Sequence, residues 1–381
     1  MAEQHAAQMK ANPSAVDDGS VAAVPGPTDA MPTAVTPARR LSGPDSRLIA
    51  GAAGVASFLW ASFAAVVFAR QTHLVFNPVR EPEVQRPRSA GHRTRRVVLR
   101  AADGTRLCGW LMTPHAPGRH PGVLYFGGRS EEVSWVARDA SRMFPGMTVL
   151  AMNYRGYGES SGVPGEAAIM QDAAMLWDWL AAHHRVDARR VAVVGRSLGS
   201  GVAVQVAAQR PVASLVLITP YDSLVSLARR RFFRTIPVAW MLRHRFESVK
   251  FAARLQTRIL VLRAEQDDVV PPAHTDKFVA SLPSQPLDQT IAGSDHCTIP
   301  YLEAAQQAIA GFLHAGFQRL PESSPAVEEA TAVAAISAVA SASAAAVAAA
   351  EGSAPAVAGA RLMAEAAARA TMAAAQAADQ A

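Results

Sequence analysis

Two serines of this chain, Ser160 and Ser197, stand at the centre of the pattern Gly-x-Ser-x-Gly. This pattern can carry a nucleophilic hydroxyl on a sharp turn between a strand and a helix. The apolar residues 191–194 lead directly into Ser197, and the helix-favouring residues 202–208 follow it. Turn residues surround Ser160 instead, so that neither a strand nor a helix adjoins it. The context therefore predicts Ser197 as a nucleophile and assigns Ser160 no catalytic role.

A serine hydroxyl is a weak nucleophile at neutral pH, so it needs a base that an acidic group orients. For a serine on such a turn, the expected chain order is serine, then acid, then histidine. His296 lies in the small-residue loop 292–297, between a short apolar edge and a helix that begins near Tyr301. His296 is therefore the predicted base. The other late histidines lie in charged, proline-flanked or helical segments: His244, His274 and His314.

Three aspartates are candidates for the acid. Asp267 and Asp268 come soon after the apolar run 258–263. Asp222 follows the preceding apolar run, and the cap of a helix N-terminus is its alternative role. We predict Asp267 as the acid and keep Asp268 and Asp222 as alternatives.

The oxyanion that forms on the substrate needs two donors aimed at it in advance. The amide of Leu198 is one, because this residue follows the nucleophile, and the other is expected from the turn after the apolar run 122–126. Gly127 and Gly128 let this turn bend toward the serine. The amide of Arg129 is therefore the predicted second donor, with Gly128 as the alternative. Only backbone groups are required, and we predict no metal and no organic cofactor.

Apolar runs and helix-like segments alternate between residues 96 and 320. This alternation predicts an α/β fold with a mostly parallel central sheet and helices on both faces. Asp103 and Gly104 predict a hairpin between the first two strands. Ser197 comes directly after its strand, where such sheets place their sites. The strands are expected at 96–100, 106–112, 122–126, 148–153, 191–194, 214–218 and 258–263, and the helices at 131–144, 166–184 and after Ser197.

Residues 48–69 contain no charged side chain and are bracketed by Arg47 and Arg70. About 20 apolar residues suffice for a helix to span a bilayer, so this run predicts a single transmembrane helix. A buried core helix is the alternative, and a cleaved signal peptide fits less well because the run is too long. Arginines flank the run on both sides, which leaves the side of the membrane that holds the catalytic domain open.

The other segments complete the organisation of the 381 residues. Residues 1–47 are predicted to be a disordered tail, 70–95 an extended linker, 96–320 the catalytic domain and 321–381 an alanine-rich, low-complexity tail. The net charge of +6 is not gathered into lysine-rich runs, which disfavours nucleic-acid binding. Two cysteines are too few for a disulfide framework or a thiolate metal site.

Four stretches resemble the alpha/beta-hydrolase superfamily: 125–128, 153–162, 195–201 and 219–224. They are most similar to a branch of short, often N-terminally anchored hydrolases that includes lipid esterases and protein depalmitoylases. The resemblance implies the alpha/beta-hydrolase fold, with Ser197 as nucleophile, Asp267 as acid and His296 as base. The chain departs from the family at Arg129, where asparagine is usual, and at Ala264, where glycine is frequent.

These features predict a membrane-anchored serine hydrolase that cleaves a carboxylic ester or thioester through an acyl-enzyme. A small-molecule acyl ester or thioester is the expected substrate, and a lipid and an acylated protein are candidates for it. Two alternatives stay open: a serine peptidase on the same fold, and a catalytically silent hydrolase fold that serves as a binding module. The segment 229–246 mixes arginines with bulky apolar residues, and we expect it either to cap the site or to pack on the sheet.

Overall fold

The computed structural model describes residues 46–82, 85, 87–231 and 241–319. The chain divides into two units, residues 1–57 and 58–381. Both predicted tails lie outside the described residues, except that Ser46 and Arg47 begin a helix. Residues 232–240 of the arginine-rich segment also lie outside them.

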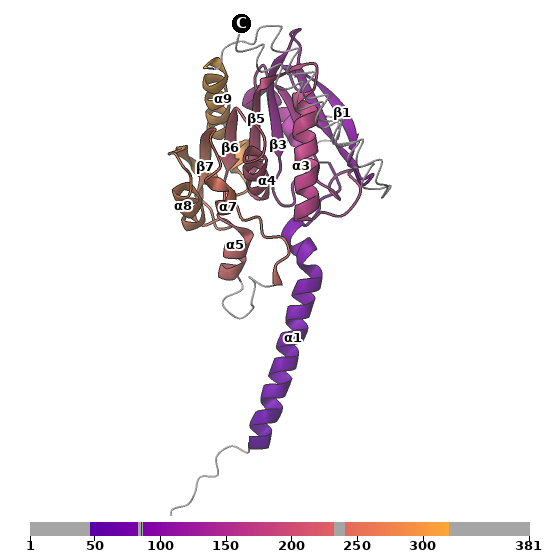
Figure 1. Ribbon diagram of the computed structural model, residues 1–381, viewed down its shortest axis with the longest axis vertical. Helices are drawn as coiled ribbons and strands as arrows, with labels where there is room; N and C mark the ends of the chain where they lie inside the picture. Colours follow the sequence, from indigo (N-terminus) through magenta and orange to yellow (C-terminus); the bar gives the residue numbers. More distant parts are fainter. Residues whose placement is uncertain (1–45, 83–84, 86, 232–240, 320–381) are drawn as a thin grey trace, which may run out of the picture. The chain divides into compact units, whose positions relative to one another are not determined.

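A central sheet organises the second unit, and within the described residues it has eight strands in the order β1-β2-β4-β3-β5-β6-β7-β8 (Figure 1). β1 and β2 form the predicted hairpin, β2 pairs antiparallel with β4, and every later pair is parallel. The predicted α/β fold is therefore confirmed. The strands are β1 (His92–Arg100), β2 (Arg106–Pro114), β3 (His120–Phe126), β4 (Thr148–Met152), β5 (Val186–Arg196), β6 (Ser214–Ile218), β7 (Arg258–Gln266) and β8 (Leu287–Asp295).

Helices cover both faces of the sheet because its strands are apolar on both sides. Successive side chains of a strand point to opposite faces, so Val193 packs in the core beneath α3 and α4, and Val194 packs in the core beneath α2 and α9. Among the described residues that follow β1, the helices are α2 (Ser134–Met143), α3 (Glu166–Ala181), α4 (Leu198–Ala207), α5 (Leu224–Arg231), α7 (Val249–Ala252), α8 (Pro272–Ala280) and α9 (Glu303–Gln318), with a 3-10 turn, η2, at Ile299–Tyr301.

Helix α1 (Ser46–Phe76) contains the run that we predicted to span a membrane. Its segment Ile49–Phe76 is long and apolar enough to do so, by length and composition. In the second unit, the side chains of Phe58 and Val66 are 71% and 60% exposed. Such exposure of large apolar side chains does not fit the alternative of a buried core helix.

Helix α1 continues to Phe76, so the prediction of an extended linker from residue 70 is wrong for the first residues of that segment. The polar residues that follow Ala69 include neither glycine nor proline, and nothing in them ends a helix. The helix ends at Asn77, which has a φ of 45° and directly precedes Pro78. A proline disfavours helical backbone at the residue before it, and asparagine tolerates the left-handed conformation that closes a helix.

Candidate active site

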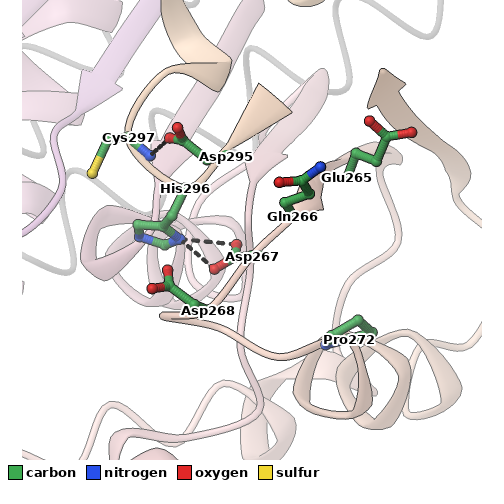
Figure 2. A pocket seen from close by; sticks show the side chains of 8 residues that line it. All are labelled: Glu265, Gln266, Asp267, Asp268, Pro272, Asp295, His296 and Cys297. Atoms are coloured by element: carbon green, nitrogen blue, oxygen red, sulfur yellow. Dashed lines mark hydrogen bonds and ion pairs between the residues drawn. The ribbon is translucent and has the colours of Figure 1, made fainter. Parts of the chain in front are cut away.

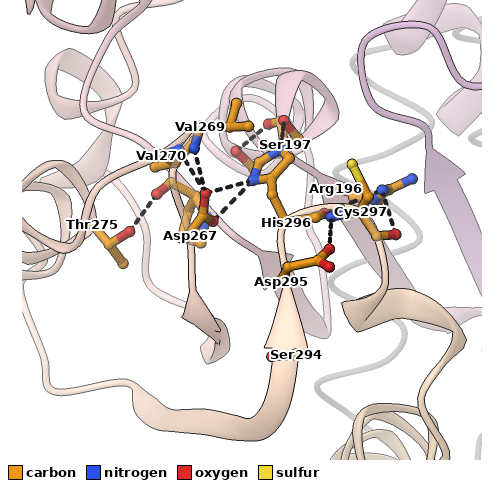
Figure 3. A network of polar contacts seen from close by, with 12 residues as sticks. Arg196, Ser197, Asp267, Val269, Val270, Thr275, Ser294, Asp295, His296 and Cys297 are labelled. Carbon is orange, nitrogen blue, oxygen red and sulfur yellow. Dashed lines mark hydrogen bonds and ion pairs between the residues drawn. The ribbon is translucent and has the colours of Figure 1, made fainter.

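Ser197, Asp267 and His296 each follow the last residue of a strand, namely β5, β7 and β8. These strands run parallel in one sheet, so their carboxyl ends meet at the same edge. Figure 3 shows the imidazole of His296 between the serine and the aspartate. The structure thus brings together the three side chains that the sequence singled out.

His296 forms hydrogen bonds through both of its ring nitrogens. Its Nδ1 lies 3.0 and 2.9 Å from the two carboxylate oxygens of Asp267, and its Nε2 lies 2.9 Å from Oγ of Ser197. An ionised carboxylate only accepts, so Nδ1 carries the ring proton and Nε2 of the neutral imidazole accepts from the serine hydroxyl. This is the arrangement that a general base requires.

The backbone at Ser197 is strained, with φ 49° and ψ −116°. The two glycines of the motif make this turn possible. A Cβ atom on Gly195 would lie 2.3 Å from the carbonyl oxygen of Gly199, and one on Gly199 would lie 2.2 Å from that of Phe126. The amide of Ser197 donates to the carbonyl of Ile218 at 2.8 Å. Close packing and this bond hold the conformation that presents the hydroxyl.

Asp267 is itself held in place by its own loop. Its Oδ1 accepts from the amides of Val269 at 3.0 Å and Val270 at 2.7 Å. The side chains of Asp267 and His296 are only 6% and 9% exposed, so little water competes for their bond. Hydrogen bonds to a charged group are stronger in such surroundings.

The other two aspartates lie in different environments. Asp222 is fully buried and bonds Nδ1 of His274 and Nζ of Lys277, each at 2.8 Å. Burial alone would raise the pKa of Asp222, but the bonds from Lys277 and His274 together hold it below its ordinary value. Asp222 therefore pairs with His274 and not with His296. Asp268 is exposed and lines the pocket beside His296.

Ser160, at the centre of the second motif, has a structural environment. It is 1% exposed; its Oγ accepts from the amide of Cys108 at 2.8 Å and donates to the carbonyl of Asn153 at 3.0 Å. These bonds join β2 to the loop after β4. The hydroxyl of Ser160 therefore has its hydrogen-bond partners within the fold.

The turn predicted to supply an oxyanion donor adjoins the serine. A Cβ atom on Gly128 would lie 3.5 Å from Cβ of Ser197. The amide of Gly128, however, donates to Oε2 of Glu131 at 2.7 Å, which makes it the weaker of the two alternatives. The amides of Arg129 and of Leu198, the first residue of α4, stay the predicted donors.

The sequence did not reveal the role of Glu131, which we expected only to begin a helix. This buried carboxylate also accepts from the hydroxyl of Tyr125 at 2.8 Å, from Nε1 of Trp135 at 3.0 Å and from Nη1 of Arg196 at 2.7 Å. Burial, followed by the charge of Glu131, raises the pKa of Tyr125, so its hydroxyl stays protonated and donates. Glu131 thereby fixes the turn that holds Gly128.

Arg196 extends this network to the histidine loop. Its Nη2 donates to the carbonyl oxygens of His296 at 3.3 Å and Cys297 at 3.1 Å. The signal in the sequence was an arginine directly before Ser197, at the end of an apolar strand. A buried cation there needs a buried anion, and Glu131 supplies it.

Glu131→Gln is expected to lower the free energy of unfolding by about 3 to 5 kcal/mol, because it leaves the buried charge of Arg196 without its partner. Asp276→Asn is the matched control, since it removes an exposed carboxylate that also pairs with an arginine, Arg263. We expect a change of at most about 1 kcal/mol from the control. Denaturant unfolding measures both, and equal losses would contradict the importance of the buried pair.

A pocket of about 730 Å³ lies beside the histidine (Figure 2). Its lining includes His296 and Asp267, whereas Ser197 is not part of it. The pocket is lined by Glu265, Gln266, Asp267, Asp268, Pro272, Asp295, His296 and Cys297.

Among the described residues, no group of three or more His, Cys, Asp or Glu side chains could hold a metal ion.

Parts of the chain are similar to known proteins. Residues 119–251 match the family model described as serine aminopeptidase, S33. An uncharacterized protein of Mycobacterium tuberculosis strain H37Rv is 32% identical over 246 residues, which cover 64% of this chain and 84% of that protein. The alpha/beta hydrolase domain-containing protein WAV2 of Arabidopsis thaliana is 26% identical over 200 residues, 48% of this chain and 65% of the relative. The chain belongs to the alpha/beta-hydrolase superfamily.

Two further matches place this hydrolase among its relatives. The lysophosphatidylserine lipase ABHD12 of Danio rerio is 26% identical over 245 residues, which cover 53% of the hydrolase and 63% of the relative. The acetyl xylan esterase of Paenibacillus sp. R4 shares the fold with a TM-score of 0.50 at 22% identity, over 68% of the hydrolase and 93% of the esterase. The predictions of the family, of the fold and of a hydrolytic enzyme are confirmed.

Proposed function

We propose that this hydrolase is anchored by α1 as a single-pass membrane protein and cleaves a carboxylic ester or thioester through an acyl-enzyme. The observation that carries the proposal is the pair of hydrogen bonds of His296, to Ser197 at one nitrogen and to Asp267 at the other. The lysophosphatidylserine lipases among the relatives support an acyl lipid as substrate. An acylated protein, whose acyl group is attached through a thioester, is the other candidate substrate.

In the first half of the reaction, Oγ of Ser197 attacks the carbonyl carbon while Nε2 of His296 takes the hydroxyl proton. The electron pair of the carbonyl moves to its oxygen, and the amides of Leu198 and Arg129 would stabilise that charge. Asp267 stabilises the imidazolium. When the tetrahedral species collapses, the bond to the alcohol or thiol breaks, and the leaving group takes the proton from His296.

In the second half, water repeats the same steps on the acylated Ser197. His296 takes one proton from the water while the water oxygen bonds the acyl carbon. The second tetrahedral species then collapses, with Oγ of Ser197 as the leaving group. The proton on His296 returns to Oγ, and the carboxylic acid departs. Every proton transfer passes through Nε2, so one histidine serves both halves.

The position of the site along α1 supports a substrate at the membrane surface. Arg70 is the first charged residue after the apolar run, and the carbonyls of Leu74 and Phe76 bond the turn of Arg129 and Ser130. At 1.5 Å per helical residue, these carbonyls lie about 6 to 9 Å beyond Arg70. The polar layer of a bilayer is about 5 to 8 Å deep on each side. The scissile carbonyl of an acyl lipid would then lie at the depth of the site.

A panel of acyl esters, acyl thioesters and peptide amides tests the function directly. We expect turnover of the esters and thioesters by the purified full chain in detergent micelles. Activity on peptide amides without activity on acyl esters would favour the serine peptidase instead. No turnover of any class, together with no labelling by a fluorophosphonate, would favour the silent binding module.

A chain that begins at Gln71 is expected to be soluble and active, because it lacks the apolar run but keeps every residue assigned to the reaction. It also keeps the last turns of α1, which contact the hydrolase unit. Sedimentation after lysis and ester turnover measure the two properties. An insoluble or unfolded product would show that the apolar run belongs to the core and would overturn the membrane anchor.

A further inference from the structure

The last turn of α1 bonds the turn that holds Arg129. The final carbonyls of a helix lack partners within it and must find them elsewhere. The carbonyl of Leu74 accepts from Nε of Arg129 at 3.0 Å, and that of Phe76 accepts from the amide of Ser130 at 3.2 Å and from the hydroxyl of Tyr157. A cation at this end also suits the negative end of the helix dipole. The predicted oxyanion turn thus supplies hydrogen-bond donors to the last carbonyls of α1.

Ser130 has a left-handed backbone, with a φ of 58°. A residue with a Cβ atom adopts this conformation at a free-energy cost and keeps it only where its surroundings impose it. Here the surroundings are α1 and its cap, since the amide of Ser130 bonds Phe76 and its Oγ accepts from Nδ2 of Asn77 at 2.7 Å. Without these bonds, the turn would be free to relax and to move the adjacent amide of Arg129.

The same end of α1 is itself firmly anchored in the hydrolase unit. Phe76 is fully buried and its ring lies 4.9 Å from that of His244. The side chain of Gln71 accepts from the amide of Arg243 at 2.7 Å, and Thr72 bonds Nε2 of His244 at 3.2 Å. The helix end therefore connects the oxyanion turn to the segment before α7 and can act as a rigid support.

We propose that the end of α1, with its cap Asn77, is a positioning element of the active site that holds the oxyanion turn in its left-handed conformation. The proposal rests on the proposed role of the Arg129 amide. Asn77 and Phe76 act through Ser130 and do not touch the substrate. The last turn of the helix that anchors the enzyme, which a chain beginning at Gln71 keeps, would then also be required for full turnover.

The test compares Ser130→Ala with Ser130→Gly in the full chain, in detergent micelles with p-nitrophenyl acetate. Both variants lose the bond to Asn77, but only glycine takes a positive φ without cost. We expect Ser130→Ala to lower kcat about tenfold with little change in KM, and Ser130→Gly to stay within about threefold of the wild type. Asn77→Gly, which keeps the positive φ of the cap, should resemble Ser130→Ala. His73→Ala is the control, because this exposed side chain lies in the same turn of α1.

The affinity of a trifluoromethyl ketone distinguishes a misplaced oxyanion donor from a loss of overall protein stability in these variants. This inhibitor forms an oxyanion on the nucleophile, so its affinity should fall by the same factor as kcat/KM in Ser130→Ala and Asn77→Gly. Equal losses in Ser130→Ala and Ser130→Gly, or wild-type kcat in Ser130→Ala, would overturn the proposal. If Asn77→Gly does not fold, the two Ser130 variants decide. Ester turnover that Ser197→Ala abolishes would leave the proposed function intact whatever these variants do.

Discussion

Ser197→Ala is expected to abolish labelling by a serine-reactive fluorophosphonate and to lower kcat for an acyl ester by about 10⁶, the size of loss seen when a comparable nucleophile is removed. The reason is that His296 would have no hydroxyl to deprotonate, and no acyl-enzyme could form. In-gel fluorescence and ester turnover measure the two effects. Residual turnover would come from the oxyanion donors and substrate binding alone.

Ser160→Ala is the matched control, because the same hydroxyl is removed from the same sequence pattern. Its Oγ bonds the backbone of Cys108 in β2 and of Asn153 directly after β4, so we expect some loss of stability but labelling close to that of the wild type. Labelling of the Ser197→Ala protein at the level of the wild type would remove Ser197 from the site.

Asp267→Asn is expected to lower kcat by about 10⁴, with folding and KM little changed. An amide at this position can present its NH₂ group to Nδ1 of His296, which favours the tautomer with the proton on Nε2. That tautomer cannot take the proton of Ser197, and the imidazolium also loses its stabilising charge. Steady-state kinetics on a small ester measure the loss, and circular dichroism checks the fold.

The other two aspartates provide the controls for Asp267. Asp268→Asn should lower kcat by less than about tenfold, because Asp268 is an exposed residue at the pocket and the bonds to His296 come from Asp267. Asp222→Asn should act mainly on stability, since it weakens the bonds to His274 and Lys277. A loss near 10⁴ for Asp222→Asn with a near-normal Asp267→Asn would move the acid to the end of β6.

The turn that carries Ser197, the proposed nucleophile, was readable from the sequence because the features that make it are local. An apolar strand, a turn of small residues and a helix occupy consecutive positions around Ser197, and the strained backbone needs Gly195 and Gly199 within the same motif. The hairpin at Asp103 and Gly104 is local for the same reason. Such features depend on residues a few positions apart, so a short window of the sequence contains the whole pattern.

The choice among the three aspartates needed the tertiary structure. All of them follow strands late in the chain, and chain order alone allows each one. Only the order of β6, β7 and β8 in the sheet places Asp267 against His296 and directs Asp222 to His274. Strand order depends on contacts between distant segments, which no local pattern encodes.

The supports of the site were decided entirely by such distant contacts. Glu131 meets Arg196 across the sheet edge, and Phe76 at the end of α1 meets Ser130 in the turn after β3. In the sequence, Glu131 begins an expected helix, and Phe76 lies in an expected linker. Their roles arise because a buried charge and an open helix end must each find partners, and only the folded chain brings those partners within reach.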